Sequence, residues 1–245
     1  MYYIQSITKQ EDVWQKSESY VKNISALANF EQLSFNSPIT FFVGENGSGK
    51  STLLEAIAVK YGFNPEGGSK NYSFATKDTH SPLSQMLDLA KTPKRAKDGF
   101  FLRAESFYNT ASYMEEIDHD GLSASYLESY FDGKSLHEQS HGESFLSIIE
   151  NRFWGNGIYI LDEPEAALSP SRQLTLMSHI ARLIKQNSQF IIATHSPILL
   201  AFPGAIIYSF DNKTITPISY KETEHYQITH NFLNHPERML DILLN

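Results

Sequence analysis

The sequence predicts an α/β protein with a mostly parallel central sheet and helices on both faces. Three apolar runs support this prediction, namely Ile39–Val43, Gly157–Leu161 and Phe190–Ala193. Continuous apolar runs of this length are typical of strands that are buried on both faces of a parallel sheet. Each run ends in polar residues, and we expect these residues at the carboxyl edge of the sheet, where open α/β sheets bind ligands.

The first expected strands are Tyr2–Ile7 and Phe30–Phe35, which mix aromatic, apolar and polar residues. Ile39–Val43 follows, with Thr40 as its one polar residue, and predicts a strand buried on both faces. A helix is expected over residues 51–61 because its apolar residues recur at helical spacing. These last two elements therefore form a strand, a loop and a helix in sequence.

The loop between that strand and helix fits the Walker A pattern G-x-x-x-x-G-K-[ST]. Its glycines let successive backbone N–H groups turn toward phosphate oxygens, and a helix N-terminus favours anions. Lys50 would place a positive charge on the β- and γ-phosphates, and the Ser51 hydroxyl would ligate Mg²⁺. The predicted nucleotide contacts are Gly44, Glu45, Asn46, Gly47, Ser48, Gly49, Lys50, Ser51 and Thr52.

The middle of the chain carries weaker patterns. Residues 62–80 are rich in Gly, Asn, Ser and Lys and predict a long loop. Ser81–Lys91 predicts a short helix, and Phe100–Phe107 predicts a strand. Helical segments are expected over Phe107–Ile117 and Leu122–Phe131, broken by the glycines that follow each of them.

Two carboxylates end the next strand. A helix is expected from Ser140 to a stop at Gly155, and an apolar run then leads to Asp162 and Glu163. This is the form of a Walker B strand. Asp162 would hold Mg²⁺ through water at the carboxyl edge of the sheet, and Glu163 would polarise the water that attacks the γ-phosphorus.

The last third repeats the order of strand and helix. A helix is expected over Pro170–Lys185, capped by the preceding serine, and the next strand leads to His195 near the γ-phosphate. Beyond it we expect a hairpin over Ala205–Tyr220 and helices around Tyr226–Leu233 and Glu237–Leu244.

Taken together, the motifs resemble the ABC-type ATPase superfamily, and its SMC/RecF/OLD-like branch more than its transporter branch. Asp162–Pro170 is similar to the Walker B and D-loop segment, and Thr194–Pro197 is similar to the switch-histidine segment. Phe101–Phe107 and His137–Ser144 resemble runs in small bacterial AAA/ABC-type ATPases of uncharacterised role. The resemblance implies the P-loop fold of an ABC-type ATPase head with a small helical insert.

The same resemblance implies a single domain over residues 1–245. Its nucleotide-binding lobe would comprise residues 1–106 and 156–245, and the helical insert with the family's signature would comprise about residues 107–155. In the family, that signature meets the γ-phosphate of ATP bound in the opposite subunit.

Gln139–Glu143 is similar to the signature through Ser140, Gly142 and Glu143, whereas His141 replaces a glycine. Ser140 and Glu143 also form a capping box, with which any helix can begin. Both interpretations can hold, because a capped helix N-terminus also binds anions.

At the Q-loop position, where the family usually has a glutamine that contacts Mg²⁺ or water, this chain offers Glu105. Arg103 is an alternative phosphate sensor, and a surface ion pair between the two residues is a third interpretation. Tyr20 and Trp14 are candidates to stack on adenine, although core packing is the preferred interpretation of both.

The resemblance implies ATP hydrolysis with ATP and Mg²⁺ bound, and a homodimer with ATP at its interface. Lys50, Glu163 and His195 would be the catalytic residues, and Ser51, Asp162 and Glu105 the metal contacts. DNA and a separately encoded effector protein stay open as partners in a DNA-related or defence-type process. The alternatives are an ATPase subunit of a membrane transporter and a nucleotide-gated adaptor.

The composition of the chain limits which metal sites, partners and locations we expect. The chain has 245 residues, no cysteine and a net charge of −8. The missing thiols exclude disulfides and Cys-based zinc sites, and the charge argues against a surface that coats nucleic acid broadly. No apolar run is long enough to span a bilayer and the start has no signal sequence, so we expect no membrane insertion and a cytoplasmic location.

Overall fold

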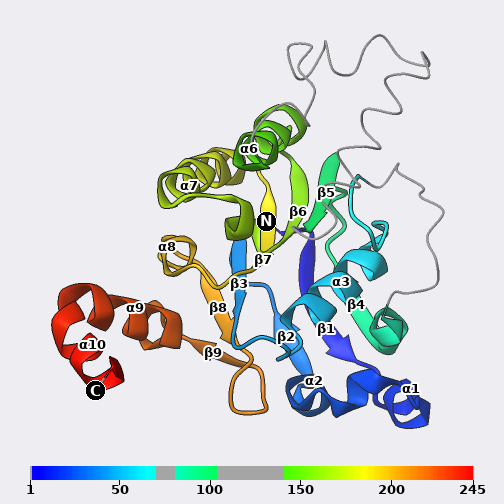
Figure 1. The fold of residues 1–245 in the computed structure, drawn as a ribbon. Helices are drawn as coiled ribbons and strands as arrows, with labels where there is room; N and C mark the ends of the chain where they lie inside the picture. The colour runs from blue at the N-terminus through cyan, green and yellow to red at the C-terminus, as the bar shows by residue number, and fades with distance from the viewer. Residues whose placement is uncertain (1, 70–80, 104–140, 245) are drawn as a thin grey trace.

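The computed structural model of the protein describes residues 2–69, 81–103 and 141–244. Within them lie a three-stranded sheet of order β2-β1-β4 and a six-stranded sheet of order β5-β6-β7-β3-β8-β9 (Figure 1). The helices predicted over Phe107–Ile117 and Leu122–Phe131 fall outside the described residues.

The six-stranded sheet is parallel from β5 to β8, and only β9 runs antiparallel to its neighbour. This confirms the predicted, mostly parallel central sheet. Every residue of the three central strands β6, β7 and β3 is buried, as their apolar runs predict. In sheet order, the strands are β5 Asp98–Arg103, β6 Gly157–Asp162, β7 Gln189–Ala193, β3 Ile39–Val43, β8 Ile206–Ser209 and β9 Thr216–Ile218.

Helices cover both faces of this sheet, because alternate residues of each strand point to opposite sides. On one face, α3 (Lys50–Tyr61) packs in a core with Ile160 and Ile191 that also includes the small sheet. On the other face, α6 (His141–Arg152) and α7 (Pro170–Lys185) pack on Tyr159 and Leu161. Figure 1 shows these two layers on either side of the sheet.

The small sheet is antiparallel and consists of β1 (Ile4–Lys9), β2 (Gln32–Ser34) and β4 (Leu87–Lys91). The helix predicted over Ser81–Lys91 is therefore wrong in its second half. Pro82–Met86 forms a short 3-10 helix, and Leu87–Lys91 pairs with β1 along its whole length. A short apolar run is compatible with either a helix or a strand. The backbone hydrogen bonds to β1 make Leu87–Lys91 a strand.

The remaining helices complete the described chain. They are α1 Glu11–Lys16, α2 Ser25–Asn29, α8 Pro197–Leu200, α9 Glu224–Asn234 and α10 Pro236–Leu244, with 3-10 turns at Tyr20–Asn23, Pro164–Ala167 and Tyr220–Glu222. Helix α7 has its predicted bounds, and Ser169 caps it by accepting from the backbone N–H of Arg172. None of the described helices is long and apolar enough to cross a membrane.

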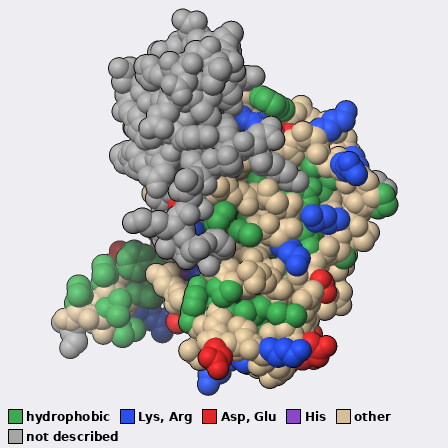
Figure 2. Space-filling model, turned by 90° about the vertical axis from the view of Figure 1, so that its right-hand side faces the viewer, with side chains coloured by type: hydrophobic (Ala, Val, Ile, Leu, Met, Phe, Trp, Pro, Cys, Tyr) green, Lys and Arg blue, Asp and Glu red, His purple; other side chains and the backbone are tan. Residues whose placement is uncertain are grey.

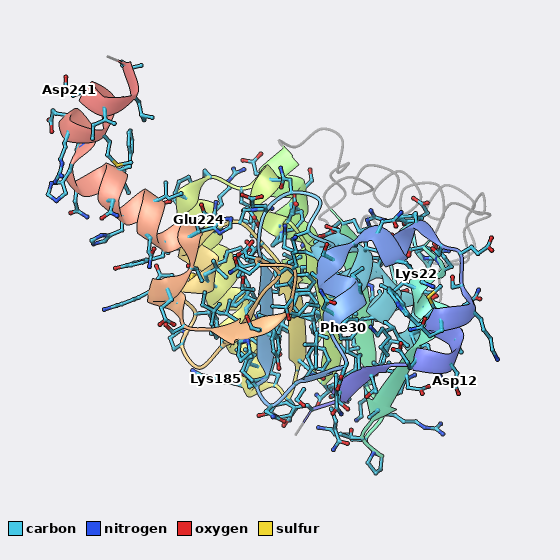
Figure 3. The ribbon with its side chains drawn as sticks, turned by 90° about the horizontal axis from the view of Figure 1, so that it is seen from below. Asp12, Lys22, Phe30, Lys185, Glu224 and Asp241 are labelled. Carbon is cyan, nitrogen blue, oxygen red and sulfur yellow. The ribbon has the colours of Figure 1, made fainter. Side chains whose placement is uncertain are left out.

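Helices α9 and α10 project from the body, with Glu224 at their base and Asp241 near their outer end (Figure 3). No residue of either helix is buried. Figure 2 shows hydrophobic side chains along these projecting helices. The exposed apolar residues on them are Ile228, Phe232, Leu233, Leu240, Ile242, Leu243 and Leu244.

Gln189, which is 1% exposed, joins the two sheets. Its Oε1 accepts from the backbone N–H groups of Tyr3 and Ile4 at 2.8 and 2.9 Å. Its Nε2 donates to the carbonyl oxygen of Ile4 at 2.9 Å. One side chain at the start of β7 therefore satisfies three backbone groups at the start of β1, and it fixes the small sheet against the large one.

Replacing this link should destabilise the fold. Gln189→Leu keeps the side chain's approximate volume but leaves the three buried backbone groups without their partner, at a cost of about 2–4 kcal/mol in the free energy of unfolding. Chemical denaturation measures the loss. The control is Gln5→Leu on the exposed side of β1, which should change stability by less than about 0.5 kcal/mol. Equal stability of the two variants would contradict this account.

Candidate active site

The register of the parallel strands brings the loops of the candidate site to one edge of the sheet. Phe42 of β3 lies opposite Ala193 of β7, which lies opposite Asp162 of β6, so the three strands end at the same level. The backbone continues this alignment, since the N–H of Glu163 donates to Ala193 and the N–H of Thr194 donates to Phe42. The three loops that the sequence singles out therefore begin side by side at one edge of the sheet.

Two glycines of the Walker A loop are required by its shape. Gly49 has φ +101°, and a Cβ there would lie 2.7 Å from Cγ2 of Ile24. Gly44 has φ +148°, and a Cβ there would meet Oδ1 of Asp211 at 3.0 Å. The loop thus packs its backbone closely against neighbouring segments, which only residues without a side chain allow at these positions.

Lys50 is 4% exposed at the start of α3. Its Nζ donates to the carbonyl oxygens of Gly44 and Glu45, both at 2.7 Å. Burial lowers the pKa of Lys50, and the nearby carboxylates of Glu163 and Asp162 oppose that shift. The ammonium group is therefore held inside the curve of the loop, where a bound phosphate would meet it.

The Ser51 hydroxyl donates to Oδ1 of Asp162 at 2.9 Å. This bond joins two of the three residues that the sequence assigns to Mg²⁺, and the third, Glu105, lies outside the described residues. No group of three or more His, Asp or Glu side chains among the described residues would hold a metal ion by itself. One hydroxyl and one carboxylate fit Mg²⁺, which usually keeps several waters and takes substrate phosphates as further ligands.

Arg103 ends β5 beside Asp162. Its Nη1 lies 2.9 Å from Oε2 of Glu55 on α3, and its Nε lies 3.9 Å from Oδ2 of Asp162. Arg103 therefore bridges the Walker B carboxylate and the Walker A helix. Glu105, the residue that the sequence offers at the Q-loop position, lies outside the described residues.

Glu163 has a left-handed backbone, with φ 50° and ψ 53°, immediately before Pro164. Such a conformation is unfavourable for a residue with a side chain, and strain of this kind is often found at functional sites. The side chain of Glu163 is 42% exposed, and its Oε1 lies 3.6 Å from Nε2 of His195. The carboxylate thus lies at the surface of the site, within reach of water.

His195 contacts three other residues of the site, Glu163, Glu165 and His225. Its backbone N–H donates to Oε1 of Glu165 at 2.5 Å, and its Nδ1 lies 2.9 Å from Nε2 of His225. Burial, followed by the charge of Lys50, lowers the pKa of His195. Burial also raises the pKa of Glu165, although the N–H of His195 opposes that shift. The shift of the His195 pKa favours its neutral imidazole.

His225 was not predicted from the sequence. It follows the first residue of α9, and it reaches the site only because the chain returns there after β9. No motif or apolar pattern around it marks a functional residue, so sequence reasoning had no signal for it.

A cavity of about 550 Å³ lies beside residues 45–48 of the Walker A loop. Residues 23–26, 45–48 and 210–213 line it together with Glu224. Neither aromatic candidate for adenine stacking is part of its wall. Trp14 is buried, with Nζ of Lys9 4.7 Å from its ring centre, and Tyr20 is exposed to solvent.

The signature residues are described only in part. Ser140 lies outside the described residues, and Gly142 falls in the first turn of α6. The exposed side chain of Glu143 accepts from Nη2 of Arg172 on α7 at 2.8 Å. Glu143 is thus in an ion pair between the two helices.

Two family models match adjoining segments of the chain. One, described as an AAA domain, matches residues 20–139, and the other, described as an AAA ATPase domain, matches residues 144–200. An uncharacterized ABC transporter ATP-binding protein of Haemophilus influenzae is 27% identical over 189 residues, which is 71% of this chain and 70% of that protein. These similarities support an ATP-binding ATPase of the AAA/ABC type.

One solved structure shows the fold. The structure of cbiO1 from Clostridium perfringens, part of the ABC transporter complex cbiONQ, aligns over 100% of both chains with a TM-score of 0.50 and 15% identity. The SMC head domain from Thermotoga maritima aligns over 77% of this chain and 93% of its own, with a TM-score of 0.41 and 17% identity. The chain has the α/β P-loop fold of ABC-type ATPases.

The close packing of Gly49 is testable against Gly47, which also has a positive φ but would place a Cβ in open space, with no atom within 4 Å. In both Gly→Ala variants, backbone strain should lower the free energy of unfolding by about 1–2 kcal/mol. In Gly49→Ala the free energy of unfolding should fall by about 1–3 kcal/mol more, because the added methyl group meets Ile24. Thermal unfolding measures the difference, and a Gly47→Ala variant as unstable as Gly49→Ala would refute the packing argument.

Proposed function

We propose that this protein is an Mg²⁺-dependent ATPase that binds ATP at the carboxyl edge of its parallel sheet. The observation that carries the proposal is the contact of Ser51 with Asp162 next to the buried ammonium of Lys50. A hydroxyl, a carboxylate and a lysine in a glycine-rich loop are the groups that a magnesium–nucleotide complex needs.

Each group has a distinct task in the proposed reaction. Lys50 and the loop amides bind the phosphates, and Ser51 and Asp162 organise Mg²⁺, which supplies charge neutralisation of the phosphates when bound. Glu163, exposed beside His195, accepts a proton from the attacking water, while a neutral His195 donates a hydrogen bond to a γ-phosphate oxygen. Catalysis then rests on positioning and charge stabilisation, as in phosphoryl transfer generally.

The site is proposed to be completed by a second copy of the chain. This part of the proposal is supported by the likeness of residues 139–143 to the ABC signature and by the position of Gly142 and Glu143 at the start of α6. ATP would then lie between two protomers in the cytoplasm, and hydrolysis would release them. In a DNA-related or defence-type process, this association would act as the switch.

A transporter ATPase subunit is the second candidate. The Haemophilus influenzae relative is named as an ABC transporter ATP-binding protein, which favours this role. The altered signature, with His141 in place of a glycine, counts against it. Affinity purification from cells separates the two roles, since a transporter subunit would co-purify with a membrane protein and an independent ATPase would not.

Lys50→Ala should weaken ATP binding about 10- to 100-fold, because it removes the cation that meets the phosphates. Titration with a fluorescent ATP analogue measures the affinity. Lys60→Ala, near the other end of α3, is the matched control and should bind like the wild type. Undiminished binding by Lys50→Ala would be inconsistent with the proposed phosphate site.

Glu163→Gln should keep ATP binding and lower the turnover number about 10²- to 10⁴-fold, because an amide does not accept the proton of the attacking water. Phosphate release measures turnover, and light scattering with ATP should detect a persistent dimer. Glu237→Gln on α10 is the control for loss of one exposed carboxylate. Unchanged turnover together with no dimer would refute the proposal.

A further inference from the structure

The imidazole of His195 has a partner that no motif explains. Its Nδ1 lies 2.9 Å from Nε2 of His225, and the two ring centres are 5.0 Å apart with a tilt of 47°. A hydrogen bond between two ring nitrogens requires one protonated and one unprotonated nitrogen. The contact therefore links the protonation of Nδ1 in His195 to that of Nε2 in His225.

The surroundings of His195 decide which ring donates. Its Nε2 lies 3.6 Å from the carboxylate of Glu163, which when ionised accepts hydrogen bonds and does not donate them. A proton on Nε2 is attracted to that carboxylate, whereas a lone pair there is repelled. A neutral ring with its proton on Nε2 has an unprotonated Nδ1, so Nε2 of His225 must donate.

The surroundings of the other ring nitrogen of His225 also favour donation from Nε2 of His225 to Nδ1 of His195. Nδ1 of His225 is buried and has no hydrogen-bond partner among the described residues. The same holds for Nε2 of His195, but that nitrogen has the carboxylate of Glu163 3.6 Å away. A buried acceptor without a partner occurs more readily in proteins than a buried N–H without one. Burial and the charge of Lys50 lower the pKa of His225, which favours the neutral ring with a single proton. That proton then lies on Nε2, facing His195.

We propose that His225 is a positioning residue that holds His195 in the tautomer protonated at Nε2. This inference rests on the proposed function, in which that N–H faces the γ-phosphate. In the opposite tautomer, Nε2 would present a lone pair to an anionic oxygen. His225 does not contact the reacting atoms in this account, and it acts only through His195.

The first turn of α9 keeps His225 in place. Thr223, which is 1% exposed, accepts from the N–H of Tyr226 at 3.3 Å and donates to the carbonyl of Tyr220 at 2.7 Å. Figure 3 shows that α9 leaves the body just beyond Glu224. The anchored end of α9 is thus the end that carries the contact with the site.

Nitrogen NMR of protein labelled with ¹⁵N-histidine tests the tautomer without relying on activity. The resonances of His195 are assigned by their loss in His195→Gln. We expect His195 to be protonated at Nε2 in the wild type and to become a mixture of tautomers in His225→Leu. A wild-type His195 protonated at Nδ1, or a tautomer that does not change in His225→Leu, would overturn the inference.

Kinetics provide the second test. His225→Leu should lower kcat for ATP about 3- to 10-fold with little change in KM, because one hydrogen bond to His195 is lost. His225→Gln should recover most of the rate, since its amide N–H can donate to Nδ1. In a His195→Ala background, His225→Leu should cause no further loss. Full activity of His225→Leu, or additive losses in the double variant, would contradict the positioning role.

The control is His230→Leu, which removes another histidine of α9 and should not change kcat. Thermal melts establish that each variant folds, and His225→Met replaces His225→Leu in both tests if the leucine variant is unfolded. Absence of ATPase activity in the wild type would refute the proposed function, and the NMR result would then decide the tautomer alone. Normal wild-type activity with a fully active His225→Leu would refute only the role of His225.

Discussion

The parallel pairing of β6, β7 and β3 is the constraint on which the rest of the site depends. Because these strands are in register, Asp162, Ala193 and Phe42 lie at one level, and each loop starts from a fixed point. The bond between Ser51 and Asp162 then joins two segments that are 111 residues apart in the sequence. Gln189 contributes from the opposite end of β7, where it holds the small sheet in place.

The negative charge at this edge of the sheet explains why ATP binding there would require a cation. Lys50 is buried near four carboxylates, those of Glu163, Asp162, Asp211 and Glu165. A triphosphate would add further negative charge close to Asp162 and Glu163, and repulsion between them would oppose binding unless a cation lay between. Mg²⁺ held at Ser51 and Asp162 would offset both sets of charges. Burial and the charge of Lys50 lower the pKa of His195 and favour its neutral form, against the opposing charges of Glu163 and Asp211.

Local patterns were enough to predict the strands of the central sheet and the bounds of α7, because burial on both faces and a capping serine leave clear marks in the sequence. They failed for Leu87–Lys91, whose structure depends on pairing with β1. They gave no sign of His225, because its contact with His195 exists only in the folded chain. The motif residues that are described, by contrast, were predicted from their spacing and from the family resemblance, and the folded chain brings Lys50, Ser51, Asp162, Glu163 and His195 to one edge of the sheet.

Titration with a non-hydrolysable ATP analogue, with and without Mg²⁺, tests the central claim most directly when wild type and Asp162→Asn are compared. The account predicts that Mg²⁺ strengthens binding by the wild type at least about 10-fold and that this gain is mostly lost in Asp162→Asn, because the neutral amide is a poor partner for the hydrated metal. An equal gain from Mg²⁺ in both proteins, or none in the wild type, would contradict it.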